Sequence, residues 1–289
     1  MLTLPQKRGH SPFVRSTLRA VPANGGCPLF CSAALFALCA PALGPAEDVA
    51  FTARWDGSQQ RYVLMLPDGF KPGQAHDLLV ALHGHGSDRW QFVRSPRDEC
   101  RAARDVAAEH GMIYVSPDYR AKTSWMGPAA EADVVQILAE LRAKYSIGRV
   151  ILCGGSMGAT SALTFAGLHP ELVDGVAAMN GHASHVEYQG FQDAIRQSFG
   201  GTKLEKPEEY RRRSAEFAAE RLRMPIAMSV SDNDRSVPPA SAIRLAEKLK
   251  SLGRDVLLIR RPNAGHQTSY EDSRAVVEWA VGKAKAREK

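Results

Sequence analysis

The sequence has 289 residues, of which 44% are hydrophobic and 24% charged, a composition that suits one large or two small globular cores. Its net charge of +6 comes mainly from residues 1–42, which contain four basic side chains and no acidic one. The rest of the chain is close to neutral. Outside its C-terminal tail it has no basic stripe with interleaved aromatic residues, so nucleic acid is excluded as an expected partner.

Residues 1–42 have the pattern of an export signal. A basic stretch is followed by an apolar run of about 13 residues at 28–40, which ends at Ala40-Pro41-Ala42, the small-x-small pattern of a signal-peptidase site. The run is short for a permanent membrane-spanning helix, and an uncleaved anchor is the alternative. We therefore expect an exported protein, periplasmic or secreted, whose mature part is residues 43–289 and is not inserted in a membrane.

Three of the five cysteines lie in the predicted leader, which leaves Cys100 and Cys153. An oxidising compartment permits a disulfide between them. However, Cys100 lies on a predicted helix and Cys153 in a predicted core strand, so we expect two buried free thiols. The cysteines have no metal-binding spacing.

After the leader, strand-like and helix-like segments alternate. Residues 51–55 and 61–66 have the pattern of two antiparallel strands, and residues 77–82 form a continuous apolar run typical of a buried parallel strand. Further strands are predicted at residues 112–115, 150–153, 175–179, 225–230 and 255–259, and helices at residues 96–110, 129–145, 159–168, 239–252 and 271–285. This order predicts one α/β domain with a mainly parallel sheet of about eight strands and helices on both faces.

One stretch interrupts the alternation. About 45 residues separate the predicted strands at 175–179 and 225–230, with helical patterning at 191–199 and 207–222. This is too long for a plain crossover between strands. We predict a small cap-like insertion at about 182–223 that overhangs the site described next.

The pentapeptide Gly154-Gly155-Ser156-Met157-Gly158 lies between a predicted strand and a predicted helix. A sharp strand-to-helix turn strains its central residue and leaves no space for side chains two positions to either side, which explains the outer glycines. The side chain at the tip is the hydroxyl of Ser156. The pattern predicts that Ser156 is a nucleophile.

Polar residues follow other predicted strands, at the edge where an open parallel sheet binds ligands. A serine needs a base to become nucleophilic, and that base needs an acid to fix its tautomer. His266 follows the last predicted strand, and Asp232 and Asp234 lie in the loop after the strand before it. The order nucleophile, acid, histidine is the one expected for this fold type. The spacing to Val237-Pro238 favours Asp234 as the acid and leaves Asp232 a turn role.

From about residue 50 to its end, the chain resembles the α/β-hydrolase superfamily, and within it the single-domain esterase and prolyl-oligopeptidase-like branch. The matching motifs are His83-Gly84-His85-Gly86, the pentapeptide around Ser156, Asp234-Arg235-Ser236-Val237-Pro238 and Gly265-His266. The resemblance implies the α/β-hydrolase fold and a serine hydrolase that uses Ser156, Asp234 and His266 and needs no cofactor.

The oxyanion of such a reaction needs preorganised backbone amides. The amide of Met157, directly after the nucleophile, is one candidate. His85 and Gly86 both qualify as the second donor, and the resemblance favours His85. Metal binding by His83 and His85 is not expected, because two histidines two residues apart without a nearby carboxylate are a weak metal motif.

Trp125 and Tyr119 are the residues that we expect to bind substrate. Trp125 lies in a loop next to Gly127 and Pro128 that has no periodicity, and Tyr119 follows a predicted strand. The alternative for both is a packing role, which is common for aromatic residues near strand ends.

The sequence thus predicts an exported serine hydrolase that cleaves a small-molecule or polymer ester through an acyl-enzyme on Ser156. One alternative is a serine peptidase, which the resemblance allows. Oligopeptidases of that branch usually carry a large N-terminal propeller, and the short stretch between the predicted cleavage site and the first strands favours the esterase. The other alternative is an inactive binding protein with the same fold.

Overall fold

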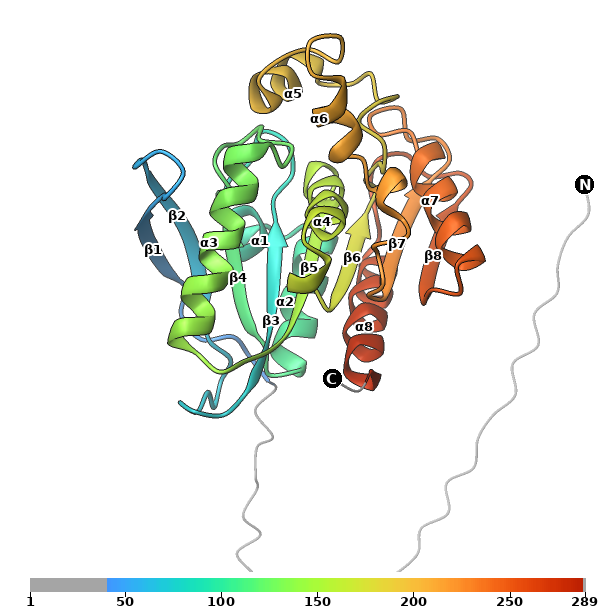
Figure 1. Cartoon of the computed structure of the whole chain (residues 1–289). Coiled ribbons are helices and arrows are strands. Elements are labelled where there is room, and N and C mark those ends of the chain that lie inside the picture. The colour runs from blue at the N-terminus through green and yellow to red at the C-terminus, as the bar shows by residue number, and fades with distance from the viewer. Residues whose placement is uncertain (1–40, 288–289) are drawn as a thin grey trace, which may run out of the picture. The chain divides into compact units, whose positions relative to one another are not determined.

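The computed structural model describes residues 41–287, so nearly all of the predicted export signal lies outside the described residues. The described residues form one eight-stranded sheet in the order β1-β2-β4-β3-β5-β6-β7-β8 (Figure 1). The strands are β1 (Glu47–Thr52), β2 (Gln59–Met65), β3 (His76–Leu82), β4 (Ile113–Pro117), β5 (Ile147–Gly155), β6 (Gly175–Met179), β7 (Ile226–Ser231) and β8 (Val256–Arg261). Strand β2 is antiparallel to β1 and to β4, and the other neighbours are parallel. The prediction of a mainly parallel sheet of about eight strands is confirmed.

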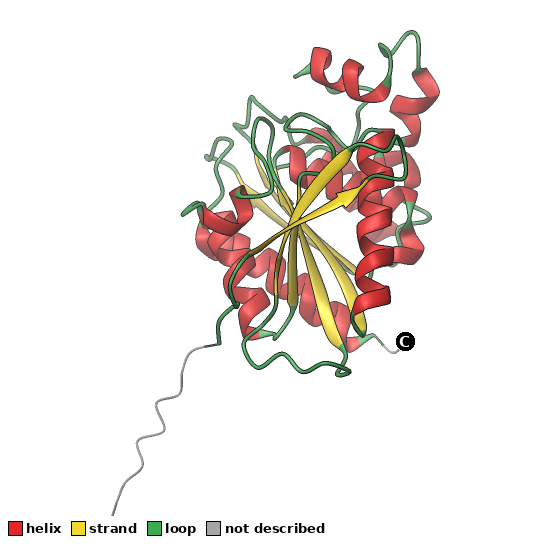
Figure 2. Ribbon diagram, turned by 90° about the vertical axis from the view of Figure 1, so that its left-hand side faces the viewer, coloured by secondary structure: helices red, strands yellow, loops and turns green. Residues whose placement is uncertain are grey.

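Helices cover both faces of the sheet, as Figure 2 shows from the side. They are α1 (Gln91–Arg94), α2 (Asp98–Glu109), α3 (Pro128–Lys144), α4 (Met157–Leu168), α5 (Gln192–Phe199), α6 (Pro207–Arg212), α7 (Ala240–Ser251) and α8 (Tyr270–Ala286), with 3-10 helices η1 (Pro170–Leu172) and η2 (Ala215–Ala218). Side chains of α3, α4 and α7 pack into the core on one face, and those of α1, α2 and α8 into the core on the other.

The central strands supply side chains to both cores. In β3, Leu78, Val80 and Leu82 belong to the core under α3 and α4. Leu79 and Ala81 point to the opposite core, with α2 and α8. All five are buried. A strand covered on both faces has no polar side, which is why the sequence of β3 reads as a continuous apolar run.

The parallel strands gather the predicted site residues at one edge of the sheet. Leu82 of β3 lies opposite Gly154 of β5, so the loops that follow these strands leave the sheet side by side. Strands β6, β7 and β8 run parallel to β5, and the loops after them reach the same edge. This carboxyl edge is where open α/β sheets bind their ligands.

Two helical segments differ from the prediction. The single turn α1, in the loop after β3, was not expected. The helix predicted at residues 207–222 is broken between α6 and η2. The break has a local cause, because the hydroxyl of Ser214 donates to the carbonyl of Tyr210 and competes with the helical hydrogen-bond pattern. It also directs the side chain of Arg213 into the protein, where it is fully buried.

The segment between β6 and β7 contains α5, α6 and η2. In Figure 1, α5 and α6 lie beyond the carboxyl edge of the sheet, at the top of the view. The structure thus brings the predicted insertion to the same edge as the predicted site residues.

Cys100 lies in α2 and Cys153 in β5, and both are buried and free, as predicted. Both belong to the core on the α2 and α8 face. Burial raises the pKa of the Cys100 thiol to about 12, and it also raises that of Cys153. Both side chains are therefore neutral thiols.

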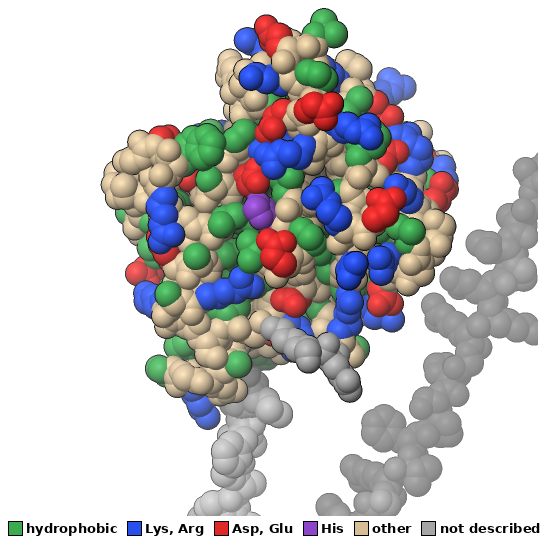
Figure 3. All heavy atoms as spheres, in the orientation of Figure 1, with side chains coloured by type: hydrophobic (Ala, Val, Ile, Leu, Met, Phe, Trp, Pro, Cys, Tyr) green, Lys and Arg blue, Asp and Glu red, His purple; other side chains and the backbone are tan. Residues whose placement is uncertain are grey.

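The surface shown in Figure 3 carries Lys and Arg side chains interspersed with Asp and Glu. This mixture agrees with the near-neutral composition of the chain after its first 42 residues. Within residues 41–287, none of the helices has the length and apolar character needed to cross a bilayer.

Candidate active site

Ser156 lies at the tip of a sharp turn between β5 and α4. Its backbone has φ of 57° and ψ of −122°, a strained conformation for a residue with a side chain. A Cβ atom at Gly158 would overlap the carbonyl oxygen of Leu82, and one at Gly154 would overlap the backbone of Gly158. The strained serine and the need for both outer glycines are as the sequence predicted.

His266 lies between Ser156 and Asp234. Its Nε2 is 2.9 Å from the hydroxyl oxygen of Ser156, and its Nδ1 is 2.7 Å from Oδ2 of Asp234. The Asp234 side chain is 1% exposed, whereas that of His266 is 34% exposed. The loops after β5, β7 and β8 thus bring the three predicted residues into one hydrogen-bonded row. In this geometry an imidazole can take the hydroxyl proton while the carboxylate stabilises the charge that it gains.

The second oxygen of Asp234 fixes the orientation of its carboxylate. Oδ1 accepts hydrogen bonds of 2.9 Å from the backbone amides of Ser236 and Val237. The turn role expected for Asp232 is therefore wrong, because Asp234 makes both turn hydrogen bonds itself. Asp232 instead accepts a 2.7 Å hydrogen bond from the Arg260 side chain.

Asn180 supports the histidine loop. Its side-chain amide donates a 2.8 Å hydrogen bond to the backbone carbonyl of His266. Asn180 follows β6, and its φ of 53° is left-handed, a conformation that asparagine tolerates better than most residues. Sequence reasoning missed this role. The signal available was the Asn180-Gly181 pair at the end of a predicted strand.

Of the two predicted oxyanion donors, His85 lies in the loop after β3 and Met157 is the first residue of α4. The amide of Gly86 donates to the carbonyl of Lys122 over 2.8 Å and is therefore occupied. In the described part of the chain, no acceptor is assigned to the amide of His85 or to that of Met157. Of the two candidates in the first loop, His85 is the one with a free amide.

Ser156 and His266 line a cavity of about 620 Å³. One side of the cavity is charged and consists of Arg97, which precedes α2, and of Asp98 and Glu99, the first residues of that helix. The other lining residues are Gly84, His85, Gln91, Phe92, Pro96, Gly155, Met179, Asn180, Phe191, Ser236, Gln267 and Thr268. The cavity combines an apolar wall with a charged one beside the serine hydroxyl.

Trp125 and Tyr119, which the sequence analysis expected to bind substrate, are not among the described residues that line the cavity. Tyr119 is 1% exposed, and its hydroxyl donates to the carbonyl of His83 over 2.6 Å. Trp125 is fully buried, and its indole nitrogen donates to Nδ1 of His85 over 3.1 Å. Its ring packs beside that of Phe191 from the insertion, which covers it and lines the cavity instead.

His83 faces the protein rather than a ligand. Its ring nitrogens lie 2.9 and 3.2 Å from the backbone carbonyl oxygens of Gly84 and Asp118. Burial lowers the pKa of His83. The pKa of His85 is also lowered, mainly by burial and to a smaller extent by the nearby His83. Within the range that the structure describes, no group of three or more potential metal ligands occurs.

The family model described as the prolyl oligopeptidase family matches residues 100–286. No curated protein matches the chain. Among solved structures, the acylaminoacyl peptidase of Pyrococcus horikoshii has a TM-score of 0.63 and 17% identity, over 86% of this chain and 43% of the peptidase. The chain spans 36–43% of the length of such peptidase structures.

Two other similar structures are matched over most of their own length. The ferulic acid esterase from Anaeromyces mucronatus has a TM-score of 0.59 and 15% identity, over 83% of this chain and 92% of the esterase. The S-formylglutathione hydrolase from Agrobacterium tumefaciens has a TM-score of 0.63 and 14% identity, over 84% of this chain and 99% of the hydrolase. At these identities the similarity shows the fold, and the predicted α/β-hydrolase fold is confirmed.

Proposed function

The chain belongs to the prolyl oligopeptidase family of serine hydrolases, and on that premise we propose that it hydrolyses carboxylic esters through an acyl-enzyme on Ser156. The observation that carries this proposal is the hydrogen-bonded row from Ser156 through His266 to Asp234, which opens on a cavity of about 620 Å³. Nucleophile, base and orienting acid are the complete set that acyl transfer requires.

The proposed reaction has two steps. His266 takes the proton from the Ser156 hydroxyl as its oxygen attacks the ester carbonyl, and gives this proton to the departing alcohol. Water then attacks the acyl-enzyme with His266 again as the base, which releases the acid and restores the serine. Asp234 holds the histidine tautomer throughout, because its other oxygen is fixed by two backbone amides.

The negative charge that develops on the carbonyl oxygen would be held by the amides of His85 and Met157. Both are free of other partners within the described residues. Each preorganised donor of this kind lowers the barrier by about 2.7–4 kcal/mol.

A small-molecule or polymer ester is the proposed substrate class. The apolar wall formed by Phe92, Met179 and Phe191 suits a hydrophobic acyl or alcohol group. The similarity to a ferulic acid esterase, of which 92% is covered, also supports an ester.

A peptidase is the second candidate, and Glu99 favours it. This residue lines the cavity, and its Cγ lies close to Gly155, next to the nucleophile. None of the described basic residues forms an ion pair with it. A carboxylate in this place could bind the α-ammonium group of a peptide substrate.

Export also belongs to the proposal. It rests on the leader pattern of residues 1–42 and on the cleavage motif Ala40-Pro41-Ala42. Expression of the full chain, followed by N-terminal sequencing of the mature protein, should give Leu43 as the first residue. Retention of the leader on a membrane-bound protein would support the anchor instead.

The enzymatic proposal is tested with an active-site label and two substrates. A fluorophosphonate probe should label the wild-type protein and not Ser156→Ala. An unlabelled wild type would indicate the inactive binding protein. Turnover of short p-nitrophenyl esters without turnover of prolyl-peptide amides supports the esterase, and the reverse supports the peptidase. In the second case, Glu99→Gln should lower kcat/KM for peptides with a free amino terminus about tenfold and leave N-acylated peptides unchanged.

A further inference from the structure

The turn before α3 holds two consecutive residues in an unfavourable conformation. Trp125 and Met126 have φ values of 45° and 56°, in the left-handed region that residues with side chains adopt at a cost. Such a turn persists only when contacts from outside the loop hold it. Both side chains are fully buried.

The insertion between β6 and β7 supplies these contacts. Nη1 of Arg213 donates a 2.6 Å hydrogen bond to the carbonyl of Met126. The hydroxyl of Ser198, in α5, donates to the carbonyl of Ser124. A Cβ atom at Gly127 would overlap Ser198, so the turn and the insertion are in direct backbone contact.

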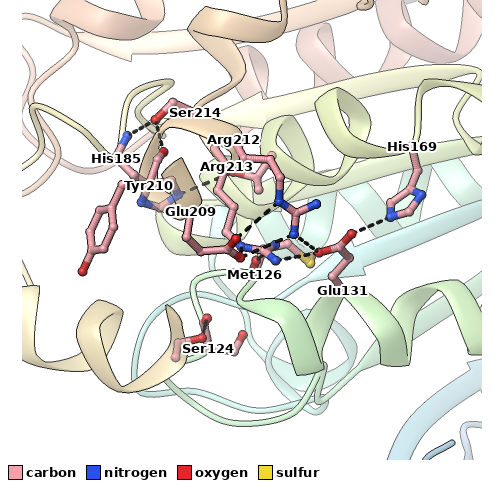
Figure 4. Close-up of polar contacts among 12 residues, drawn as sticks. Ser124, Met126, Glu131, His169, His185, Glu209, Tyr210, Arg212, Arg213 and Ser214 are labelled. Atoms are coloured by element: carbon pink, nitrogen blue, oxygen red, sulfur yellow. Dashed lines mark hydrogen bonds and ion pairs between the residues drawn. The ribbon is translucent and has the colours of Figure 1, made fainter. Parts of the chain in front are cut away.

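The charge of Arg213 is fully satisfied inside the protein. Its Nη2 lies 2.6 Å from Glu131 of α3, and its Nε lies 2.5 Å from Glu209 of α6. Figure 4 shows the arrangement, in which Arg213 points between the two glutamates and the Met126 carbonyl, while Arg212 and His169 extend the network outwards. The guanidinium reaches three separate acceptors because Nε, Nη1 and Nη2 donate in fixed and different directions, which a compact ammonium group does not reproduce.

The same turn supports the predicted oxyanion loop. The indole nitrogen of Trp125 donates to Nδ1 of His85 over 3.1 Å. The His85 ring is also in contact with that of Phe191, with 4.1 Å between ring centroids. The backbone amide of this same His85 is the one left free next to Ser156.

We propose that Arg213 is a positioning residue for the oxyanion hole, acting through the turn at Met126 and the Trp125 indole on His85. This inference rests on the proposed function, because it assumes that the His85 amide receives the oxyanion. It makes the insertion part of the catalytic geometry, although Arg213 touches neither the cavity nor the nucleophile.

The test compares Arg213→Lys with Arg212→Lys. Arg212 is a matched control, since it contacts the same two glutamates at 3.2 and 3.4 Å but not Met126, and its side chain is 46% exposed. We expect Arg213→Lys to lower kcat about 10- to 100-fold with KM changed less than threefold, because a misplaced donor loses transition-state binding selectively. Arg212→Lys should stay within threefold of wild type in both constants.

Trp125→Phe removes the hydrogen bond from the indole to His85 and leaves the ion pairs of Arg213 intact. It therefore tests the proposed positioning of His85 even if Arg213→Lys does not fold. It should also lower kcat at nearly constant KM. A folded Trp125→Phe with wild-type kcat would overturn the proposal, as would a folded Arg213→Lys with wild-type kcat.

A spectroscopic readout separates this inference from the enzymatic proposal. In two-bond ¹H–¹⁵N spectra, Nδ1 of His85 should appear as a hydrogen-bond-accepting nitrogen in the wild type and in Arg212→Lys, and should shift in Arg213→Lys and Trp125→Phe. If the wild type hydrolyses neither esters nor peptides, the proposed function fails, and these shifts still decide whether Arg213 positions His85. An unchanged His85 signal in both variants would refute the positioning role.

Discussion

The side-chain amide of Asn180 donates a 2.8 Å hydrogen bond to the backbone carbonyl of His266. The two residues belong to loops that follow different strands, β6 and β8, and β7 lies between these strands in the sheet. The contact therefore ties the proposed base to a strand that carries neither the proposed nucleophile nor the proposed acid.

Replacing Asn180 should loosen the position of His266. Asn180→Gly removes the amide and tolerates the left-handed backbone, whereas Asn180→Ala removes the amide and adds strain of about 1–2 kcal/mol. We expect both to lower kcat about tenfold, and only the alanine variant to lose stability in thermal unfolding. A glycine variant with wild-type kcat would show that the loop holds His266 without this bond.

The roles of the two aspartates separate in a paired substitution. Asp234→Asn should lower kcat/KM by a factor on the order of 10³–10⁴, because an amide stabilises the wrong histidine tautomer. Asp232→Asn should change it less than threefold, since Asp232 pairs with the half-exposed Arg260. Steady-state kinetics on one p-nitrophenyl ester measures both. Equal losses would contradict the assignment of the acid.

The outer glycines of the serine turn are required by close backbone contact. Gly158→Ala would force a methyl group against the Leu82 carbonyl and should lower the free energy of unfolding by about 1–3 kcal/mol. Gly155→Ala is the control, because its Cβ would meet the Cγ of Glu99 at 3.4 Å, an ordinary contact distance. Urea denaturation followed by circular dichroism measures the difference. Equal destabilisation by both changes would mean that the steric argument is wrong.

Glu131 should make the fold less stable at low pH. Burial alone would raise the pKa of this carboxyl, but the hydrogen bond to His169 and the charges of Arg213 and Arg212 outweigh it and hold the pKa at about 2. Because this is below the ordinary value of 4.5, ionised Glu131 stabilises the folded state above about pH 4.5, by about 3 kcal/mol, and this is lost as the pH falls towards 2. Glu131→Gln should therefore be less stable than wild type at pH 7 and approach it near pH 2. A pH-independent difference would exclude this mechanism.

Asp133, two residues further along α3, should behave in the opposite sense. Burial raises its pKa to about 6, although the charge of Arg120 opposes the shift. The folded-state pKa lies above the ordinary 3.8, so the contribution of the protonated carboxyl is complete below about pH 3.8 and is lost as the pH rises through 6. Asp133→Asn should thus be more stable than wild type at pH 8, by about 1–3 kcal/mol, and equal to it near pH 4. Chemical denaturation at the two pH values measures this, and destabilisation at pH 8 would contradict it.

The sheet and the serine turn were predictable because local patterns encode them. The apolar run of β3 and the glycines around Ser156 reflect contacts that any sequence with this backbone must respect. Ser156, Asp234 and His266 each follow a predicted strand. Because those strands are parallel, their carboxyl ends, and with them the three residues, lie at one edge of the sheet.

The cavity wall was not predictable in the same way. Trp125 lies in a loop that looks exposed in sequence, and it is buried because an insertion more than 60 residues later in the chain covers it. The inward position of Arg213 likewise depends on distant acceptors, which lie in α3 and in the turn before it. Helical periodicity carries no information about such long-range partners.

The two buried thiols can report how often the core on the α2 and α8 face opens to solvent. Cys100 and Cys153 lie in the same core, beneath α2 and α8, and their raised pKa values keep them unreactive while that core is closed. A maleimide reagent would therefore modify them only during transient exposure, at a rate that measures how often this face of the sheet opens. Cys153 lies in β5, three residues before Ser156, and Cys100 follows the cavity residue Glu99, so the rate reports the opening of the core directly beneath the proposed site.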